Sequence, residues 1–168
     1  SLKALGLPAL CCTDGPAGIR LESSDFKCVA YPAATCLAAT WNPELVTEIY
    51  HLCGNELASH HVDILLGPGT NIHRDPLCGR NFEYFSEDPL LAGLLAAAEI
   101  RGLQKNGVGA SLKHFACNSQ EYKRFSSDSI LDDRTLRELY LTPFELAVKV
   151  AQPATVMCAY NKVNGTYC

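Results

Sequence analysis

We predict an α/β fold with parallel strands for this chain of 168 residues. Four short, mostly apolar runs alternate with three helical patterns at intervals of roughly 45 residues. Continuous apolar runs are typical of strands that are buried on both faces of a parallel sheet. The alternation of strand and helix indicates βα units, whose crossovers are right-handed.

The predicted strands are short apolar runs, and each ends in a polar cluster. The runs are Leu7–Cys12, Val62–Leu66, Val108–Leu112 and Thr155–Ala159. The clusters that follow them are Thr13–Arg20, Gly67–Pro89, Lys113–Arg124 and Tyr160–Gly165. Because parallel strands end at one rim, where ligands bind in such folds, we expect the four clusters to meet at one site.

The helices are predicted from their start signals and apolar stripes. Asn42-Pro43 and Asp88-Pro89 each place a capping side chain before a proline at the first helical position. The stripe of the first helix is Leu45, Ile49, Leu52, Cys53 and Leu57. The predicted helices are 42–60, 88–104 and 132–151. Pro143 should kink or break the third helix.

The composition is that of a folded protein with little charge bias. Hydrophobic residues make up 48% and charged residues 19%, and the formal net charge is −4. This balance does not support a nucleic-acid partner and suits a neutral or small polar ligand. The longest apolar stretch, Leu90–Ala98, is far shorter than the about 20 residues of a membrane span, so we expect no membrane partner.

The nine cysteines follow no ligand or disulfide spacing, and there is no C-x-x-C pair. Several lie in apolar runs, where a free cysteine behaves as a small hydrophobic residue. We therefore expect a reduced, cytoplasmic chain with no metal or organic cofactor. A secreted or periplasmic location is the alternative if a signal sequence precedes the first residue. We interpret His60-His61 as a helix-end feature.

The polar clusters combine one carboxylate with several cations and one imidazole. These residues are Asp14, Arg20, Arg80, Lys113, His114 and Arg124. Fixed donors beside an accepting carboxylate match the hydroxyls of a sugar, each of which both donates and accepts. Phosphate is the rival ligand, but no glycine-rich phosphate loop follows any strand. A nucleophile elbow and an H-E-x-x-H motif are also absent from the sequence.

Four strings in this order carry a resemblance to a known family: TDGPAGIR, GPGTNIHRDPLCGRNFEYFSEDP, LKHFACNSQE with a later Arg, and MCAYNKVNG. From about Leu7 to its end, the chain resembles the N-terminal barrel domain of glycoside hydrolase family 3, the β-glucosidase-like enzymes. The resemblance implies a partial (β/α)8 TIM-type barrel with parallel strands, incomplete at both ends. Residues 1–168 would form part of that single domain.

The resemblance also implies roles in binding the sugar of the −1 subsite. Asp14 would accept from the far hydroxyls, and Lys113 and His114 would grip the mid-ring hydroxyls. Arg20, Arg80, Arg124 and Tyr160 match further family positions, with Tyr160 near the nucleophile and the ring oxygen. From the residues alone, Arg20 and Arg124 could instead be salt-bridge partners, and Tyr160 a core aromatic.

Other charged residues of the same rim are interpreted as structural. His73, Arg74 and Asp75 are expected to brace their loop through ion pairs, and Glu83 is interpreted as structural too. Glu121 lies where an acid could act, but the family places its acid elsewhere.

The resemblance implies that no catalytic carboxylate lies in this chain. Family members are retaining glycosidases, which use two carboxylates about 5–5.5 Å apart. The family nucleophile is an Asp roughly 30 residues beyond YNKVNG, and the acid/base comes from a second domain. We therefore expect a piece of a β-glucosidase or β-xylosidase type enzyme, inactive alone. Its partners would be a β-linked sugar, the rest of the barrel and a C-terminal domain.

Two alternatives to an enzyme fragment stay open. One is a non-catalytic sugar-binding module or degenerate pseudoenzyme. The other is a structural or regulatory domain, because fold alone does not fix function.

Overall fold

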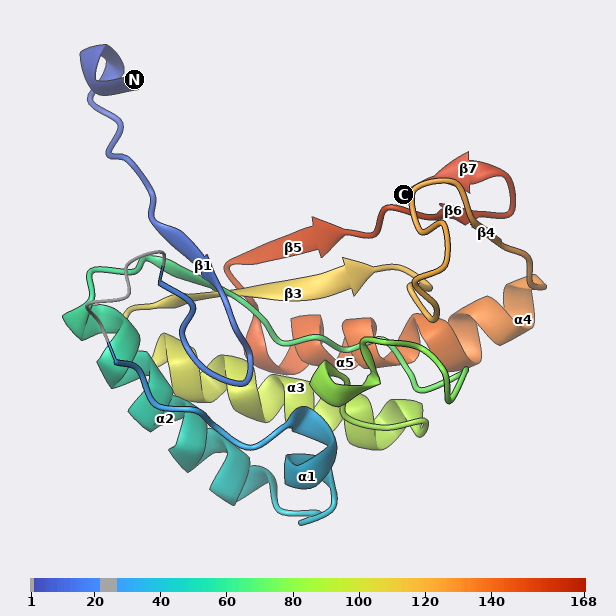
Figure 1. Cartoon of the computed structure of the whole chain (residues 1–168), viewed down its shortest axis with the longest axis horizontal. Helices are drawn as coiled ribbons and strands as arrows, with labels where there is room; N and C mark the ends of the chain where they lie inside the picture. The colour runs from blue at the N-terminus through green and yellow to red at the C-terminus, as the bar shows by residue number, and fades with distance from the viewer. Residues whose placement is uncertain (1, 22–26) are drawn as a thin grey trace.

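Four parallel strands form the main sheet of the computed structural model, which describes residues 2–21 and 27–168. They are β1 (Cys12–Asp14), β2 (Ile64–Leu66), β3 (Gly109–Phe115) and β5 (Thr155–Cys158). Neighbours in the sheet follow chain order, β1-β2-β3-β5, and every pair is parallel (Figure 1). The predicted parallel α/β fold is confirmed, and the sheet is open rather than a closed barrel.

Three long helices cover one face of this sheet: α2 (Pro43–Ser59), α3 (Pro89–Gln104) and α5 (Thr142–Ala151) (Figure 1). Buried residues of sheet and helices form one core, which includes Leu65, Ala110 and Leu112 of the strands and Val46, Leu95 and Ala147 of the helices. The helices α2 and α3 approach closely at Gly102, where an added Cβ would lie 2.5 Å from the carbonyl oxygen of Thr47. Burial on both faces holds for β3 but is wrong for the two edge strands, β1 and β5, in which most residues are exposed.

Both predicted helix starts are confirmed by their capping bonds. The Asn42 side chain accepts from the Leu45 N–H at 3.0 Å, and Asp88 accepts from the Leu91 N–H at 2.7 Å. The predicted stripe of the first helix is partly wrong, because α2 packs on α3 through a face rotated from the expected one. The buried residues of α2 are Val46, Tyr50, Cys53, Gly54 and Leu57.

The third predicted helix is broken, as expected near Pro143. It consists of α4 (Asp133–Thr135), the π-helical turn η3 (Leu136–Tyr140) and α5, with Pro143 in the first turn of α5. The wider π-helical turn changes the angular position of the following residues. Leu139 of this turn and Val148 of α5 are exposed.

The first strand is shorter and later than predicted. Leu7 and Leu10 are 51% and 66% exposed, and ladder pairing begins at Cys12, opposite Ile64. The segment from residue 2 to the strand includes the short 3₁₀ turn η1 (Leu2–Leu5) and projects away from the body of the domain (Figure 1).

Five further elements were not predicted. A small sheet of β4 (Asp128–Ser129), β6 (Lys162–Val163) and β7 (Thr166–Tyr167) joins the long polar loop to the YNKVNG segment. The other two elements are helix α1 (Ala34–Ala38) and the 3₁₀ turn η2 (Asn81–Glu83). Within the described residues, no helix has the length and apolar character of a membrane span.

Candidate functional site

A cleft of about 550 Å³ opens where β1 and β3 end. Four of the seven predicted site residues line it: Asp14, Arg20, Arg80 and Lys113. Residues 28–30 and Phe82 form other parts of its wall. The expected convergence of polar clusters is therefore seen for the first three clusters along the chain.

The TDGPAGIR segment forms one side of the cleft as a tightly closed loop. The Thr13 hydroxyl donates to the Arg20 carbonyl at 2.5 Å, and the Arg20 N–H donates back to the Asp14 carbonyl at 3.1 Å. Gly15 has φ +122°, and a Cβ there would lie 1.7 Å from the Gly18 carbonyl oxygen. Only glycine fits this turn, which holds the Asp14 carboxylate at the cleft mouth.

Lys113 joins the two sides of the cleft. Its Nζ lies 3.5 Å from Oδ1 of Asp14 and 3.3 Å from Oε2 of Glu83. The Lys113 side chain is 3% exposed and that of Glu83 4%, whereas the Asp14 side chain is 57% exposed. The exposed Asp14 carboxylate therefore has acceptor positions that a ligand can reach. The buried Glu83 carboxylate instead pairs with Arg80 and Lys113 inside the protein.

Glu83 also accepts from Nε of Arg80. Burial alone lowers the pKa of Arg80, but the hydrogen bond and charge of Glu83 outweigh it and raise that pKa. Glu83 was expected to be structural, and the structure places it between two cleft cations. The role of Glu83 could have been predicted from Lys113, because a buried ammonium group needs a carboxylate partner.

His114 is buried beside this cluster and does not line the cleft. Asn71 fixes its backbone, accepting from the His114 N–H at 2.9 Å and donating to its carbonyl at 3.0 Å. Its Nδ1 lies 3.1 Å from Oη of Tyr84, and Oη accepts from Nδ2 of Asn118 at 2.9 Å. The Tyr84 proton is thus directed at Nδ1, which assigns the ring proton of a neutral His114 to Nε2.

The surroundings keep the His114 ring neutral. Burial, followed by the charges of Arg80, Lys113 and Arg124, lowers the pKa of His114 to about 2. The imidazole is consequently a hydrogen-bonding group at physiological pH rather than a cation.

Arg124 and Tyr160 form a second group outside the cleft. Arg124 donates to Glu121 at 2.9 Å, and its guanidinium lies 5.1 Å from the ring centre of Tyr160. Tyr160 is exposed, so the alternative of a core aromatic is wrong. The salt-bridge alternative fits Arg124, whereas Arg20 is exposed and makes no ion pair within the residues described.

The loop before Arg80 is braced differently from the prediction. Nε2 of His73 lies 2.9 Å from the carbonyl oxygen of Asn81 and 2.8 Å from that of Tyr84. Among the described residues, no ion pair involves His73, Arg74 or Asp75. Backbone carbonyls accept from a neutral ring as well as a charged one, so bracing needs no ion pair.

A buried carboxyl group supports the TDGPAGIR loop from below. Tyr50 donates to the carbonyl oxygen of Pro16 at 2.7 Å, and the fully buried carboxyl group of Glu99 is close enough to affect the pKa of Tyr50. Burial raises the pKa of Glu99 well above its ordinary value, which favours the protonated form of this carboxyl group.

The fold and the cleft define a class of protein: a parallel α/β domain with a polar cleft at the carboxyl ends of its strands. The family model described as Glycosyl hydrolase family 3 N terminal domain matches residues 1–168. This chain belongs to that family. The resemblance noted in the four strings is therefore confirmed.

Relatives with high similarity carry β-glucosidase names. Thermostable β-glucosidase B of Acetivibrio thermocellus is 52% identical over 176 residues, which cover 99% of this chain and 23% of that protein. β-Glucosidase 3B from Thermotoga neapolitana, solved in complex with α-D-glucose, matches with a TM-score of 0.95 and 49% identity over 99% of this chain and 24% of that one. The β-glucosidase from Kluyveromyces marxianus in complex with glucose gives a TM-score of 0.96 at 45% identity, over 100% and 20% of the two chains. This chain thus spans about a quarter or less of each relative's length.

Proposed function

We propose that this chain provides the sugar-binding part of the active site of a retaining β-glucosidase, which removes terminal β-linked glucose from oligosaccharides or glycosides. The observation that carries this proposal is the cleft in which Asp14, Arg20, Arg80 and Lys113 converge. The glucose complexes of similar structures support glucose as the sugar.

The charges of the cleft fit hydroxyl groups better than an anion. The Asp14 carboxylate accepts hydrogen bonds, and Lys113 beside it donates, so adjacent hydroxyls can bind as donor and acceptor in turn. Lys113 and Arg80 already share Glu83, which neutralises part of their charge. A phosphate would meet the Asp14 carboxylate at the mouth, whereas a neutral sugar would not be repelled.

We assign the exposed Tyr160, its neighbour Arg124 and the buried His114 to the same site, next to the cleft. The charge of Arg124 contributes to the lowered pKa of His114, so Arg124 lies within electrostatic range of the residues beside the cleft. The nucleophile and the acid/base come, in this proposal, from residues outside 1–168. In the retaining mechanism the nucleophile attacks the anomeric carbon while the acid protonates the leaving oxygen.

The rest of the barrel would cover the exposed side of this chain. An apolar groove of about 450 Å³ lies beside the edge strand β5 and is lined by Leu112, Phe115, Leu141, Phe144, Val148 and Val156. An uncovered groove of this kind next to a strand edge would favour aggregation. We therefore assign it to the contact with the following βα units.

The test uses the native gene product. Asp14→Asn should weaken glucose binding, measured by calorimetry, by about tenfold or more, because a charged acceptor is lost. Asp133→Asn, an exposed residue of α4, is the matched control and should bind like the wild type. Equal glucose affinity in both variants would contradict the proposed site.

Hydrolysis of an aryl β-glucoside separates the enzyme from the non-catalytic alternative. The native product should cleave it, and residues 1–168 alone should not exceed background. Glucose binding without any cleavage by the native product would indicate a sugar-binding module. Cleavage by residues 1–168 that is lost in Asp14→Asn would show that the catalytic carboxylates lie within this chain.

A further inference from the structure

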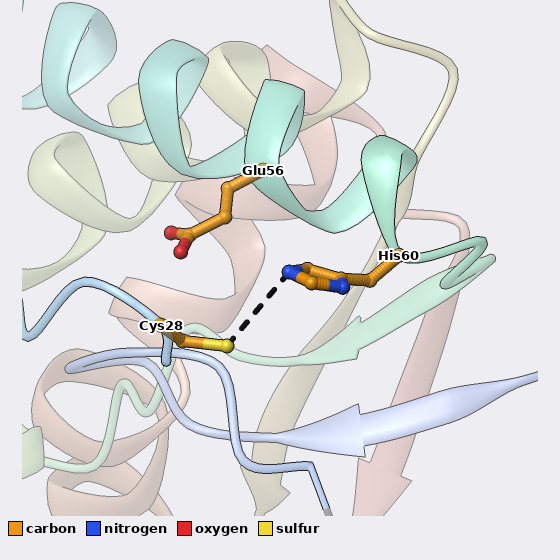
Figure 2. Close-up of side chains that lie close together, drawn as sticks. All are labelled: Cys28, Glu56 and His60. Carbon is orange, nitrogen blue, oxygen red and sulfur yellow. Dashed lines mark hydrogen bonds between the residues drawn. The ribbon is translucent and has the colours of Figure 1, made fainter. Parts of the chain in front are cut away.

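Three side chains of different metal-ligating types meet behind the wall of the cleft. Cys28 comes from the segment before α1, Glu56 from the last turns of α2, and His60 from the C-cap of that helix (Figure 2). One ligand atom from each lies within 4.8 Å of the others, and all three side chains are half-buried. Among the residues that the structure describes, this is the one such group of three or more.

The helix explains why two of the three face the same point. Glu56 and His60 are four residues apart, so they lie one above the other on one face of α2. The structure confirms that the helix ends there, with His60 as its C-cap. In Figure 2 both side chains extend from α2 toward Cys28, which approaches from the opposite side.

The distance between the sulfur and the imidazole nitrogen is close to that of a tetrahedral metal site, and the Glu56 oxygen lies within 4.8 Å of both atoms. Sγ of Cys28 lies 3.9 Å from Nε2 of His60. Zinc bound at ordinary Zn–S and Zn–N lengths would place these two atoms about 3.6 Å apart. The two values differ by about 0.3 Å.

Glu56 is held in position and still has acceptor capacity. Its Oε1 accepts from the Val29 N–H at 2.9 Å, and its Oε2 accepts from the Tyr31 hydroxyl at 3.1 Å. An ionised carboxylate has about four acceptor sites, so each oxygen keeps one for a metal. These bonds are the outer contacts that typically orient a metal ligand.

We infer that Cys28, Glu56 and His60 form a binding site for a zinc-type divalent cation. A thiolate, an imidazole and a carboxylate are the ligands that zinc uses, and three protein ligands leave a fourth position for water. Binding converts the Cys28 thiol to a thiolate bonded to the metal, and the displaced proton goes to solvent. The affinity should therefore rise with pH.

The site would connect metal binding to the cleft. Cys28, Val29 and Ala30 line the cleft wall, and Tyr31 donates its N–H to the Ala17 carbonyl in the TDGPAGIR loop at 2.9 Å. A metal ion bound by Cys28 and by Glu56 and His60 of α2 would link this wall of the cleft to the helix and restrict its movement. Sequence spacing gave no sign of the site, because Cys28 and His60 are separated by 32 positions.

The test is a titration of the native gene product with Co²⁺, whose bond to a thiolate gives a charge-transfer absorption. The wild type should show this band with one equivalent of Co²⁺ and lose it when Zn²⁺ is added. Cys28→Ser should lack the band, and His60→Asn should weaken Co²⁺ binding by about tenfold or more. Zn²⁺ should also slow alkylation of Cys28, followed by mass spectrometry.

Matched controls separate this site from the other thiols and imidazoles. Cys36→Ser removes an exposed cysteine, and His61→Asn removes the neighbouring exposed histidine, whose φ of +57° asparagine tolerates. Both should bind Co²⁺ like the wild type, and thermal melting confirms that all variants are folded. An unchanged band in Cys28→Ser, or equal losses in Cys28→Ser and Cys36→Ser, would overturn the inference.

Discussion

Lys113 and Glu83 form an almost fully buried ion pair, with Nζ 3.3 Å from Oε2, beneath the cleft of this domain. Each has a second partner: Asp14 for the lysine and Arg80 for the glutamate. Four charges from β1, η2 and β3 thus alternate in sign along one connected path. Such a network costs desolvation energy but orients Asp14 and Arg80 toward a ligand.

Removing the Lys113 charge should destabilise the protein and abolish sugar binding. Lys113→Met leaves Glu83 buried with Arg80 as its remaining partner, so we expect a loss of about 3 kcal/mol in the free energy of unfolding. Denaturant unfolding of the native gene product measures this loss. The double variant Lys113→Met, Glu83→Gln should recover much of the stability and still not bind glucose. Restored glucose binding in the double variant would show that Lys113 serves stability alone.

His114 should make the protein less stable in mild acid. Its folded pKa of about 2 lies below its ordinary value of 6.5, so between these values the unfolded chain binds a proton that the folded protein does not. Stability is therefore lost as the pH falls below 6.5, by about 2 kcal/mol from this residue at about pH 5. His114→Asn, whose Oδ1 can replace Nδ1 as the acceptor for Tyr84, should reduce this dependence. Identical pH profiles of unfolding for the variant and the wild type would contradict a neutral, buried His114.

Glu99 should make the protein less stable as the pH rises, the opposite of the effect of His114. Its folded pKa is raised above the ordinary value of 4.5 by burial, so the folded state holds a proton that the unfolded chain releases. The stabilisation is present below 4.5 and declines as the pH rises. Glu99→Gln, which resembles the protonated acid, should have a higher free energy of unfolding than the wild type in alkaline buffer and show less change with pH. A variant that is less stable than the wild type throughout would indicate that Glu99 is ionised.

The start of α3 offers a test of local stability. Asp88→Ala removes the acceptor for the Leu91 N–H and should lower the free energy of unfolding by about 1 kcal/mol. Glu87→Ala, at the exposed preceding position, is the control and should change stability by less than about 0.5 kcal/mol. Equal effects of the two substitutions in denaturant unfolding would show that helix-end charge, rather than capping, is responsible.

Sequence patterns predicted the elements whose signals are local. Asn42-Pro43, Asp88-Pro89 and Pro143 marked two helix starts and one break, because capping and proline geometry depend on neighbouring residues. The order of strands and helices predicted the parallel sheet. The strand start at Cys12 was missed, since pairing with Ile64 rather than the apolar character of Leu7 and Leu10 decides where the strand begins.

The fold class, the family and the strand ends at which polar residues collect could be predicted from the chain alone, because periodicity, capping and long motifs depend on neighbouring residues. Which of these residues contact one another became clear only from the folded structure. It placed Glu83 between Arg80 and Lys113, kept His114, Arg124 and Tyr160 outside the cleft, and brought Cys28 to Glu56 and His60. Ion pairs and metal-ligand sets depend on distances of a few ångströms between distant segments, and only the packing of α2, β1 and β3 sets those distances.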